Sequence, residues 1–261
     1  MKTRWLLLVP LMLVLSGVAR AETPEEKGLA IAREADRRDQ GWGDMQAEME
    51  MVLRNRHGQK SVRRMRTRAL EGKNDGDKTL IVFDQPRDVK GTALLTFTHK
   101  KGDDDQWLYL PALKRVKRIA SRNKSGPFMG SEFAYEDLSS QEIEKYTYKF
   151  IRNDRLGDRP VFVQERYPVS RYSGYTRQVV WLDSERYIPL KIEFYDRKNS
   201  LLKTLTFDDY KQYLGRYWRA SRMFMENHQT GKSTLLNWKA YHFRTGLKDS
   251  DFTRNALKRI R

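Results

Sequence analysis

Few residues of this 261-residue chain are of the types that carry out catalysis, and their spacing matches none of the common active-site patterns. The four histidines, His57, His99, His228 and His242, do not form the closely spaced pairs that bind zinc. The chain has no cysteine, no Gly-x-Ser-x-Gly nucleophile motif and no Gly-rich phosphate-binding loop. We therefore expect no catalytic residue, no metal ion and no cofactor, and the chain is predicted not to be an enzyme.

Paired carboxylates can act as a general acid and a general base, and two adjacent pairs occur. They are Glu136 with Asp137 and Asp208 with Asp209. Adjacent acids are common in a chain of which 33% is charged, so we interpret both pairs as solvated surface charges or as charges at a helix end. An enzyme with an unrecognised site is therefore the least favoured class of function.

The N-terminus has the pattern of a cleavable secretory signal. Two basic residues precede an apolar stretch at residues 5–18, and Ala19 and Ala21 place small side chains where signal peptidase cleaves. The stretch is shorter than the roughly 20 apolar residues of a transmembrane helix. We predict a signal peptide over residues 1–21, cleaved after Ala21, and a single domain over 22–261. Export and the lack of cysteine together indicate the bacterial periplasm.

The chain is strongly basic. It has 51 Lys and Arg residues against 34 Asp and Glu residues, which gives a formal net charge of +17. Such a charge attracts nucleic acid, anionic membrane headgroups or an acidic protein. An exported protein rarely meets nucleic acid, so we expect headgroups or an acidic partner and no nucleic acid. The alternative, that the charge only solvates the surface, stays open.

Alternation of apolar and polar residues predicts a fold made mainly of β-strands. Residues 23–40 should form a helix, with Thr23 as its cap and Pro24 in its first turn. From residue 44 onward, apolar residues recur at every second position, as in strands with one apolar face. About eleven strands are expected, at about 44–55, 78–84, 91–99, 105–111, 144–153, 159–167, 176–183, 189–196, 201–210, 216–227 and 232–243.

Strands joined at hairpin spacing form an antiparallel sheet that curls into a barrel or half-barrel. A short helix is predicted at the C-terminus, with Ser250 or Asp251 as its cap and with Phe252, Leu257 and Ile260 as its apolar contacts.

The apolar face of such a sheet must be covered, and small covers leave room for a cavity. By strand alternation, the residues that would line it are Met49, Met51, Leu95, Phe97, Trp107, Tyr109, Tyr148 and Phe150. Methionine suits a surface that accepts varied apolar ligands. The alternative, that these side chains only pack against one another, stays open at this point.

Residues 120–132 are the longest segment that fits no strand, and long irregular loops often act as lids. Gly126 and Gly130 give this segment freedom, and Phe128 and Met129 are predicted to face the cavity. A basic run without any acid lies before and within it, formed by Lys114, Arg115, Lys117, Arg118, Arg122 and Lys124. We expect the basic run to meet anionic headgroups or an acidic docking surface.

Two stretches carry a similarity to a known family. They are WLYLPALKRVKRI at residues 107–119 and FMGSEFAYEDL at 128–138. Looser similarity extends through VVWLDSERYIPLKIEFYDRKNSLLKTLTFDDY at 179–210 and RYWRASRMFMENHQTGKSTLL at 216–236. Together they resemble the LolA-like family of outer membrane lipoprotein-sorting proteins, over nearly all of the chain after residue 21.

The resemblance implies a strongly curved, incomplete antiparallel β-barrel with helices and a loop over its concave face. It also implies a periplasmic carrier that binds the acyl chains of a lipoprotein or lipid. Such carriers move their cargo toward an outer-membrane acceptor and accompany RND/MMPL-type inner-membrane transporters. The alternative on the same fold is a lipid-sensing or protein-interaction module of the cell envelope without transport activity.

Overall fold

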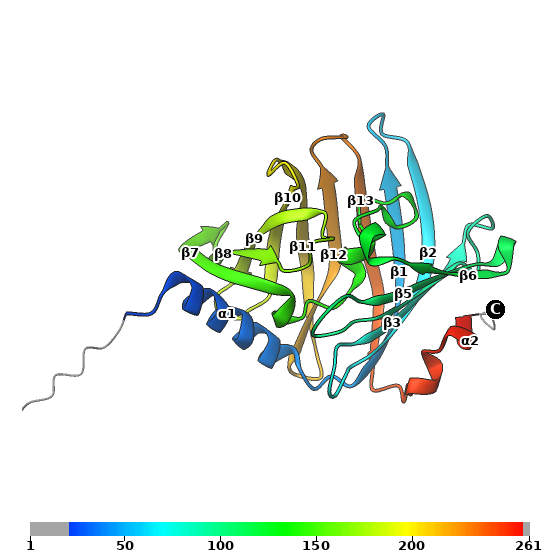
Figure 1. Ribbon diagram of the computed structural model, residues 1–261, viewed down its shortest axis with the longest axis horizontal. Coiled ribbons are helices and arrows are strands. Elements are labelled where there is room, and N and C mark those ends of the chain that lie inside the picture. The colour runs from blue at the N-terminus through cyan, green and yellow to red at the C-terminus, as the bar shows by residue number, and fades with distance from the viewer. Residues whose placement is uncertain (1–20, 258–261) are drawn as a thin grey trace, which may run out of the picture.

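One antiparallel β-sheet makes up most of the computed structural model, which describes residues 21–257 (Figure 1). The sheet has 13 strands in the order β6-β5-β4-β3-β2-β1-β13-β12-β11-β10-β9-β8-β7. Within the described residues, the end strands β6 and β7 do not pair with each other, so the sheet is open. The predicted class, mainly β with few helices, is confirmed. The predicted signal peptide up to residue 20, and Ile260, lie outside the described residues.

The strands are β1 (Asp44–Arg54), β2 (Lys60–Leu70), β3 (Lys78–Gln85), β4 (Ala93–Phe97), β5 (Asp105–Leu110), β6 (Arg115–Ile119), β7 (Tyr146–Leu156), β8 (Arg159–Pro168), β9 (Tyr175–Asp183), β10 (Pro189–Asp196), β11 (Leu201–Tyr213), β12 (Tyr217–Asn227) and β13 (Ser233–Phe243). The α-helices are α1 (Pro24–Asp39) and α2 (Arg254–Leu257). Short 3-10 helices are η1 (Pro111–Leu113), η2 (Ser121–Asn123), η3 (Phe128–Gly130), η4 (Tyr135–Leu138), η5 (Ile143–Lys145) and η6 (Asp249–Asp251).

The prediction of eleven strands was wrong by two, because β2 and β6 were missed. In β2, the buried Met65, Thr67 and Ala69 alternate with arginines, and only one of the three is strongly apolar. β6 is a short edge strand of five residues, of which three are exposed cations. Such charges protect a free edge from pairing with another chain, but they also hide the strand pattern in the sequence.

Helix α1 begins where its sequence predicts. The hydroxyl of Thr23 accepts a hydrogen bond from the amide of Glu26, and the Glu26 carboxylate accepts one from the amide of Thr23. Gly28 lies directly against β7, because a Cβ atom there would be 2.8 Å from the amide nitrogen of Phe150. The lack of a side chain at Gly28 therefore lets α1 cover the edge strand β7.

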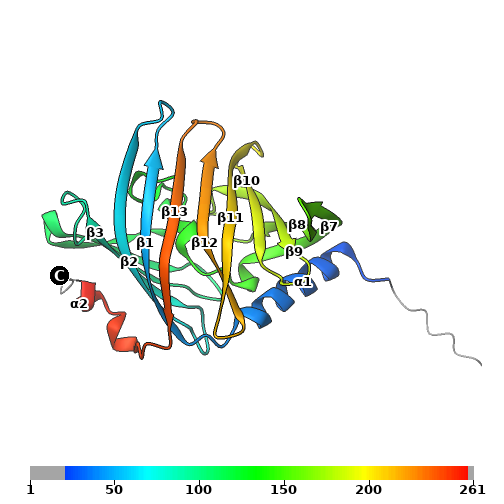
Figure 2. The same cartoon turned by 180° about the vertical axis from the view of Figure 1, so that it is seen from behind.

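The main apolar core lies on the concave face of the curved sheet, which Figure 1 shows from the front and Figure 2 from behind. Fully buried side chains of this core include Met51, Phe83 and Met225. The chain between β6 and β7 crosses this face, and its Phe128 and Phe133 belong to the same cluster. We call this chain the crossing segment and define it as residues 120–145.

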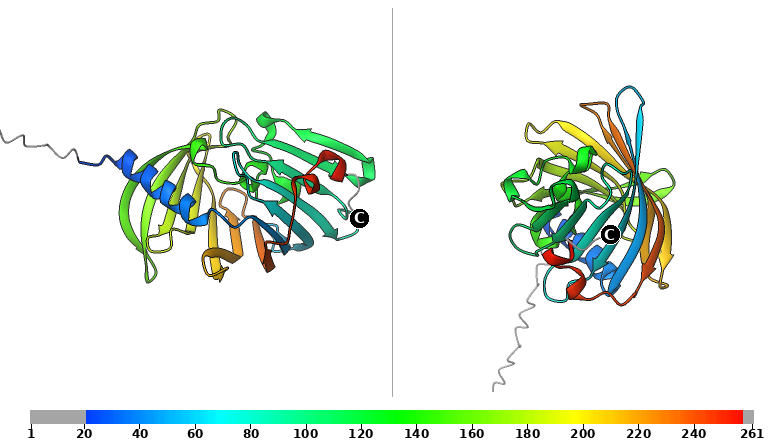
Figure 3. Two further views of the ribbon diagram at one scale, coloured as in Figure 1. Left: turned by 90° about the horizontal axis from the view of Figure 1, so that it is seen from below. Right: turned by 90° about the vertical axis from the view of Figure 1, so that its right-hand side faces the viewer.

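A second apolar cluster lies on the opposite face, where α2 packs against β4 (Figure 3). Phe252 and Leu257 are buried there, as predicted. The predicted cap was wrong, since the hydroxyl of Thr253 accepts the hydrogen bond from the first turn of α2. Ser250 and Asp251 lie one turn earlier, in η6.

Four residues predicted to line a cavity belong to this second cluster instead. They are Leu95, Phe97, Trp107 and Tyr109, whereas their neighbours Leu94 and Leu108 face the concave core. The prediction failed because strands β3 to β5 are apolar on both faces. Alternation says which residues share a face, but it does not say which face is concave.

Between residues 21 and 257, no helix is both long enough and apolar enough to cross a membrane.

Replacing Gly28 with valine should destabilise the fold, because the added side chain would meet the backbone of β7 at 2.8 Å. Forcing side chains into a well-packed site costs about 1–3 kcal/mol. Ala30→Val is the matched control, since Ala30 is exposed on the same helix and loses only about 0.5 kcal/mol of helix propensity. Thermal unfolding followed by circular dichroism measures both. Equal melting temperatures for the two variants would contradict the close packing of α1 on β7.

Candidate functional site

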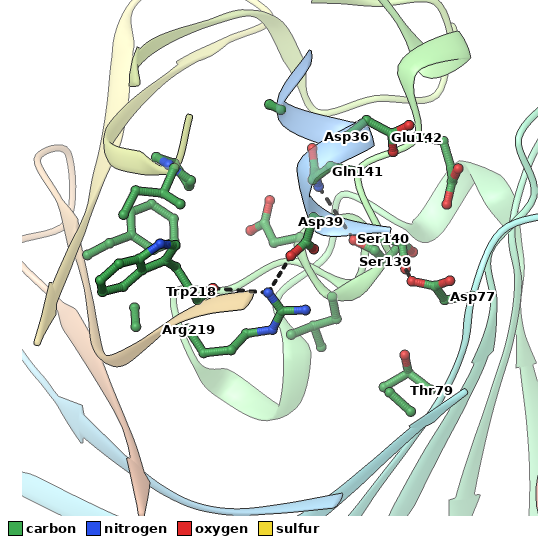
Figure 4. Close-up of a pocket in the computed structure, with 18 of the residues that line it drawn as sticks. Asp36, Asp39, Asp77, Thr79, Ser139, Ser140, Gln141, Glu142, Trp218 and Arg219 are labelled. Carbon is green, nitrogen blue, oxygen red and sulfur yellow. Dashed lines mark hydrogen bonds and ion pairs between the residues drawn. The ribbon is translucent and has the colours of Figure 1, made fainter. Parts of the chain in front are cut away.

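A cavity of about 1700 Å³ lies on the concave side of the sheet. Its walls come from α1, from strands of both halves of the sheet and from the crossing segment. Figure 4 shows part of it, with Asp36 and Asp39 on α1, Thr79 on β3 and Arg219 on β12. Elements distant in the sequence therefore enclose one space.

Buried apolar side chains from five strands form much of the lining. They are Met49 and Met51 of β1, Val180 of β9, Ile192 and Phe194 of β10, Leu205 of β11 and Leu236 of β13. Such a surface gains free energy by covering apolar ligand atoms, at about 25 cal/mol per Å². The cavity therefore suits a ligand with a large apolar part.

Of the residues predicted to line a cavity, Met49, Met51, Phe128 and Tyr148 do lie in its wall. Met129 and Phe150 are half-buried and pack against the same concave cluster. The structure thus brings these six together and leaves the four residues under α2 on the other face. Lipid binding by any of them stays a prediction.

Phe128 is part of the core and is not the exposed tip of a lid. Its side chain is 0% exposed, and its ring centroid lies 5.6 Å from those of Phe83 and Tyr135. Its amide donates a hydrogen bond of 2.7 Å to the carbonyl oxygen of Phe133. Gly130, with a φ of +76°, turns the chain back between them. The segment is therefore folded in place, and its motion as a hinged lid stays a prediction.

A buried ion pair holds the crossing segment on the sheet. Lys203 of β11 lies 2.7 Å from a carboxylate oxygen of Asp137, and the two side chains are only 4% and 6% exposed. The hydroxyl of Tyr175 donates to the same carboxylate, at 2.8 Å. Of the two interpretations of Asp137, the solvated surface charge is wrong, whereas the charge at a helix end is confirmed by its place in the first turn of η4. Its carboxylate also accepts a hydrogen bond of 2.7 Å from the amide of Ala134 at the start of η4, but Lys203 and Tyr175 are distant in the sequence, so no local pattern predicts its burial.

The neighbouring Glu136 is partnered as well. Its carboxylate accepts hydrogen bonds of 2.8 Å from the hydroxyl of Ser173 and from the amide of Gly174. Burial, and then the charge of Asp137, raise the pKa of Glu136 above its usual value. The pair Glu136–Asp137 is therefore a structural anchor of the crossing segment.

Polar contacts at the tip of the crossing segment fix it to three further strands. Glu132 accepts a hydrogen bond of 2.6 Å from the side chain of Asn227, and its amide donates one of 2.9 Å to the hydroxyl of Thr234. Arg63 of β2 donates to the carbonyl oxygen of Met129. The cover of the cavity is thus tied to β2, β12 and β13 in addition to β11.

Three carboxylates, Asp36, Asp77 and Glu142, lie together in the wall of the cavity (Figure 4). We call them the acidic group. The pKa of Glu142 is raised to about 7, mainly by burial and then by the charge of Asp77. In the described part of the chain, no set of three His, Cys, Asp or Glu side chains could hold a metal ion.

The basic run lies at the outer edge of the sheet, from the residue before β6 to the chain that follows this strand. All of its residues are exposed except Lys124, which is half-buried and lies 3.7 Å from Asp103. Arg118 pairs with Asp105 at 2.6 Å. The run is therefore placed to contact something outside the molecule rather than a ligand inside the cavity.

Comparisons with known proteins identify the family. A family model described as that of an uncharacterized protein matches residues 75–259. A solved structure described as an outer membrane lipoprotein-sorting protein domain from Vibrio parahaemolyticus is 62% identical, with a TM-score of 0.89, over 90% of this chain and 99% of that chain. The chain belongs to the LolA-like family of outer membrane lipoprotein-sorting proteins. The resemblance seen in the sequence is confirmed.

Two further structures share the fold of this LolA-like protein. A DUF1329 family protein from Desulfovibrio piger is 30% identical, with a TM-score of 0.85, over 90% of this chain and 99% of that chain. A LolA superfamily protein from Nitrosomonas europaea is 21% identical, with a TM-score of 0.70, over 88% and 98% of the two chains. No curated protein matches the chain at a significant level.

Replacing Lys203 with methionine should destabilise the protein by about 3–5 kcal/mol, because Asp137 is then left as a buried charge without its cation. The double variant Lys203→Met/Asp137→Leu removes both charges and should recover much of this loss. Denaturant unfolding measures the free energy, and hydrogen exchange over residues 128–138 reports the crossing segment. A single variant as stable as the wild type would contradict the anchoring role.

Glu142 should make the stability of the fold depend on pH. Its pKa is about 7 in the folded chain against a usual 4.5, so the unfolded chain releases this proton first as the pH rises. The contribution of Glu142 to stability therefore falls between about pH 4.5 and 7. Glu142→Gln should raise the melting temperature at pH 8 and leave it nearly unchanged at pH 4. An equal difference in melting temperature between Glu142→Gln and the wild type at pH 4 and at pH 8 would contradict the raised pKa of Glu142.

Proposed function

We propose that this LolA-like protein is a periplasmic carrier of acyl chains. It binds the chains of a lipoprotein or lipid in the concave cavity and passes them toward an outer-membrane acceptor, in partnership with an RND/MMPL-type inner-membrane transporter. Residues 1–21 act as its cleaved signal peptide and 22–261 as one lipid-binding domain. The observation that carries the proposal is the cavity of about 1700 Å³ with its buried apolar lining.

The size and lining of the cavity support this cargo. Pockets for drug-sized ligands have volumes of about 300–1,000 Å³, and this cavity is larger. Burying an acyl chain is worth about 0.8 kcal/mol per methylene, so a chain of about 16 carbons gains on the order of 10 kcal/mol before ordering costs. Met49, Met51 and Met223 in the wall are flexible enough to adapt to chains of different length.

The position of the basic run supports a docking role. Three of its exposed cations, Arg115, Lys117 and Arg118, lie on the edge strand β6, and none of the run belongs to the cavity wall. Clustered cations at a protein surface attract anionic headgroups, and each is worth about 1 kcal/mol near a membrane. In the proposed function, this edge turns toward a membrane surface or an acidic partner while the cavity holds the chains.

Filling the cavity should abolish cargo binding. In the double variant Ala35→Trp/Met223→Trp, two half-buried wall residues on α1 and β12 gain indole rings that occupy part of the space. Protein prepared without detergent is examined by native mass spectrometry for bound lipid. We expect lipid adducts on the wild type and a severalfold lower occupancy on the double variant.

The matched control is Val62→Trp/Val169→Trp, which adds two indole rings at positions that are 46% and 60% exposed. It should keep the occupancy of the wild type. Wild-type protein that repeatedly carries no lipid and takes up none would contradict the carrier. A complex with an inner-membrane protein that forms independently of lipid would favour the sensing or interaction module instead.

A further inference from the structure

One row of side chains crosses the concave face from β7 to β11, and it contains two cations. The register pairs Arg166 of β8 with Tyr148 on one side and Gln178 on the other. The register then pairs Gln178 of β9 with Phe194 of β10, and Phe194 with Lys203 of β11. Neighbours in a register point to the same face, so Arg166 and Lys203 both belong to the interior row.

The two cations differ in their partners. Lys203 is neutralised by Asp137 at 2.7 Å. Arg166 donates a hydrogen bond of 2.6 Å from Nε to the amide oxygen of Gln178, and its guanidinium lies 4.8 Å from the ring centroid of Tyr146. Within residues 21–257, no carboxylate oxygen lies within 4.0 Å of Arg166. Among the described residues, a direct ion pair therefore neutralises Lys203, whereas Arg166 forms none.

Arg166 is half-buried and lies in the wall of the cavity, beside Tyr146, Tyr148 and Gln178. A guanidinium has five N–H donors, and the bond to Gln178 uses the one on Nε. The two terminal nitrogens form a planar fork that matches a carboxylate or phosphate group. A half-buried guanidinium is screened by less water than an exposed one, which strengthens its attraction for an anion.

We infer that Arg166 binds the anionic group, a phosphate or a carboxylate, of an amphiphile whose chain occupies the cavity. The inference rests on the proposed carrier function and narrows its cargo to anionic lipids over uncharged acylated ones. The chain lies against the apolar wall that begins with Phe194, two strands from Arg166 in the same row. Tyr146 and Gln178 hold the guanidinium in position for its ligand.

Three compounds with one chain length test this inference: dodecyl phosphate, dodecanoate and dodecanol. Each displaces the uncharged fluorophore N-phenyl-1-naphthylamine from purified protein, and the concentration for half-displacement is measured. For the wild type, we expect this concentration to be about tenfold lower for an anionic compound than for dodecanol, as for a charge-assisted hydrogen bond. Arg166→Gln should bring the ratio close to one, and Arg166→Lys should restore part of it. Whichever of the two anions displaces the fluorophore at the lower concentration identifies the preferred head group.

Arg222→Gln is the matched control, since Arg222 is an exposed cation of β12 and its loss changes the net charge equally. It should keep the tenfold preference, and circular dichroism verifies that each variant is folded. If dodecanol displaces the fluorophore as well as the anions do, or if Arg166→Gln keeps the preference, the inference is overturned and the carrier stands. If the wild type binds neither the fluorophore nor any of the compounds, the carrier function itself fails.

Discussion

The buried ion pair between Lys203 and Asp137 is the contact on which the cavity depends. An open sheet cannot cover its own concave face, so chain from between β6 and β7 must lie across it. That chain brings backbone polar groups and the bulky Phe128 into a dry environment, where every polar group requires a partner. The ion pair, together with the hydrogen bonds of Glu132 and Glu136, fixes where the crossing segment sits. It therefore sets how much of the concave face is filled and how much stays open as a cavity.

Much of the fold follows from short-range patterns, which is why eleven of the strands and both helices could be predicted. The rest depends on relations between distant parts of the chain. The open sheet has two edges, and each is protected differently: β6 carries exposed cations, and β7 is covered by α1 through Gly28. Neither kind of edge protection appears in the sequence as an alternation of apolar and polar residues. β6 was not predicted because its cations mask the alternation. The contact of Gly28 with β7 joins residues more than 100 positions apart in the sequence.

The candidate site could be predicted only in part, for a related reason. Met49 and Met51 were found because they lie on a strand with one clearly polar face. Asp137 was missed because adjacent acids look alike in a sequence, whether solvated or buried. Arg166 was missed because a single arginine on a strand is usually a surface residue. The register across β7, β8 and β9 is what identifies its side of the sheet.

Release of a bound chain sets a further constraint. Lifting the crossing segment would expose Phe128 and separate Lys203 from Asp137, and each of these changes costs several kcal/mol. Spontaneous opening is therefore rare, and exchange of cargo requires either a partner that stabilises the open form or a route that leaves the segment in place. An anionic head group would be repelled by the acidic group and attracted by Arg166, so charge would orient the chain in the cavity. The direction in which the chain enters the cavity then determines which end of the chain an acceptor protein contacts first.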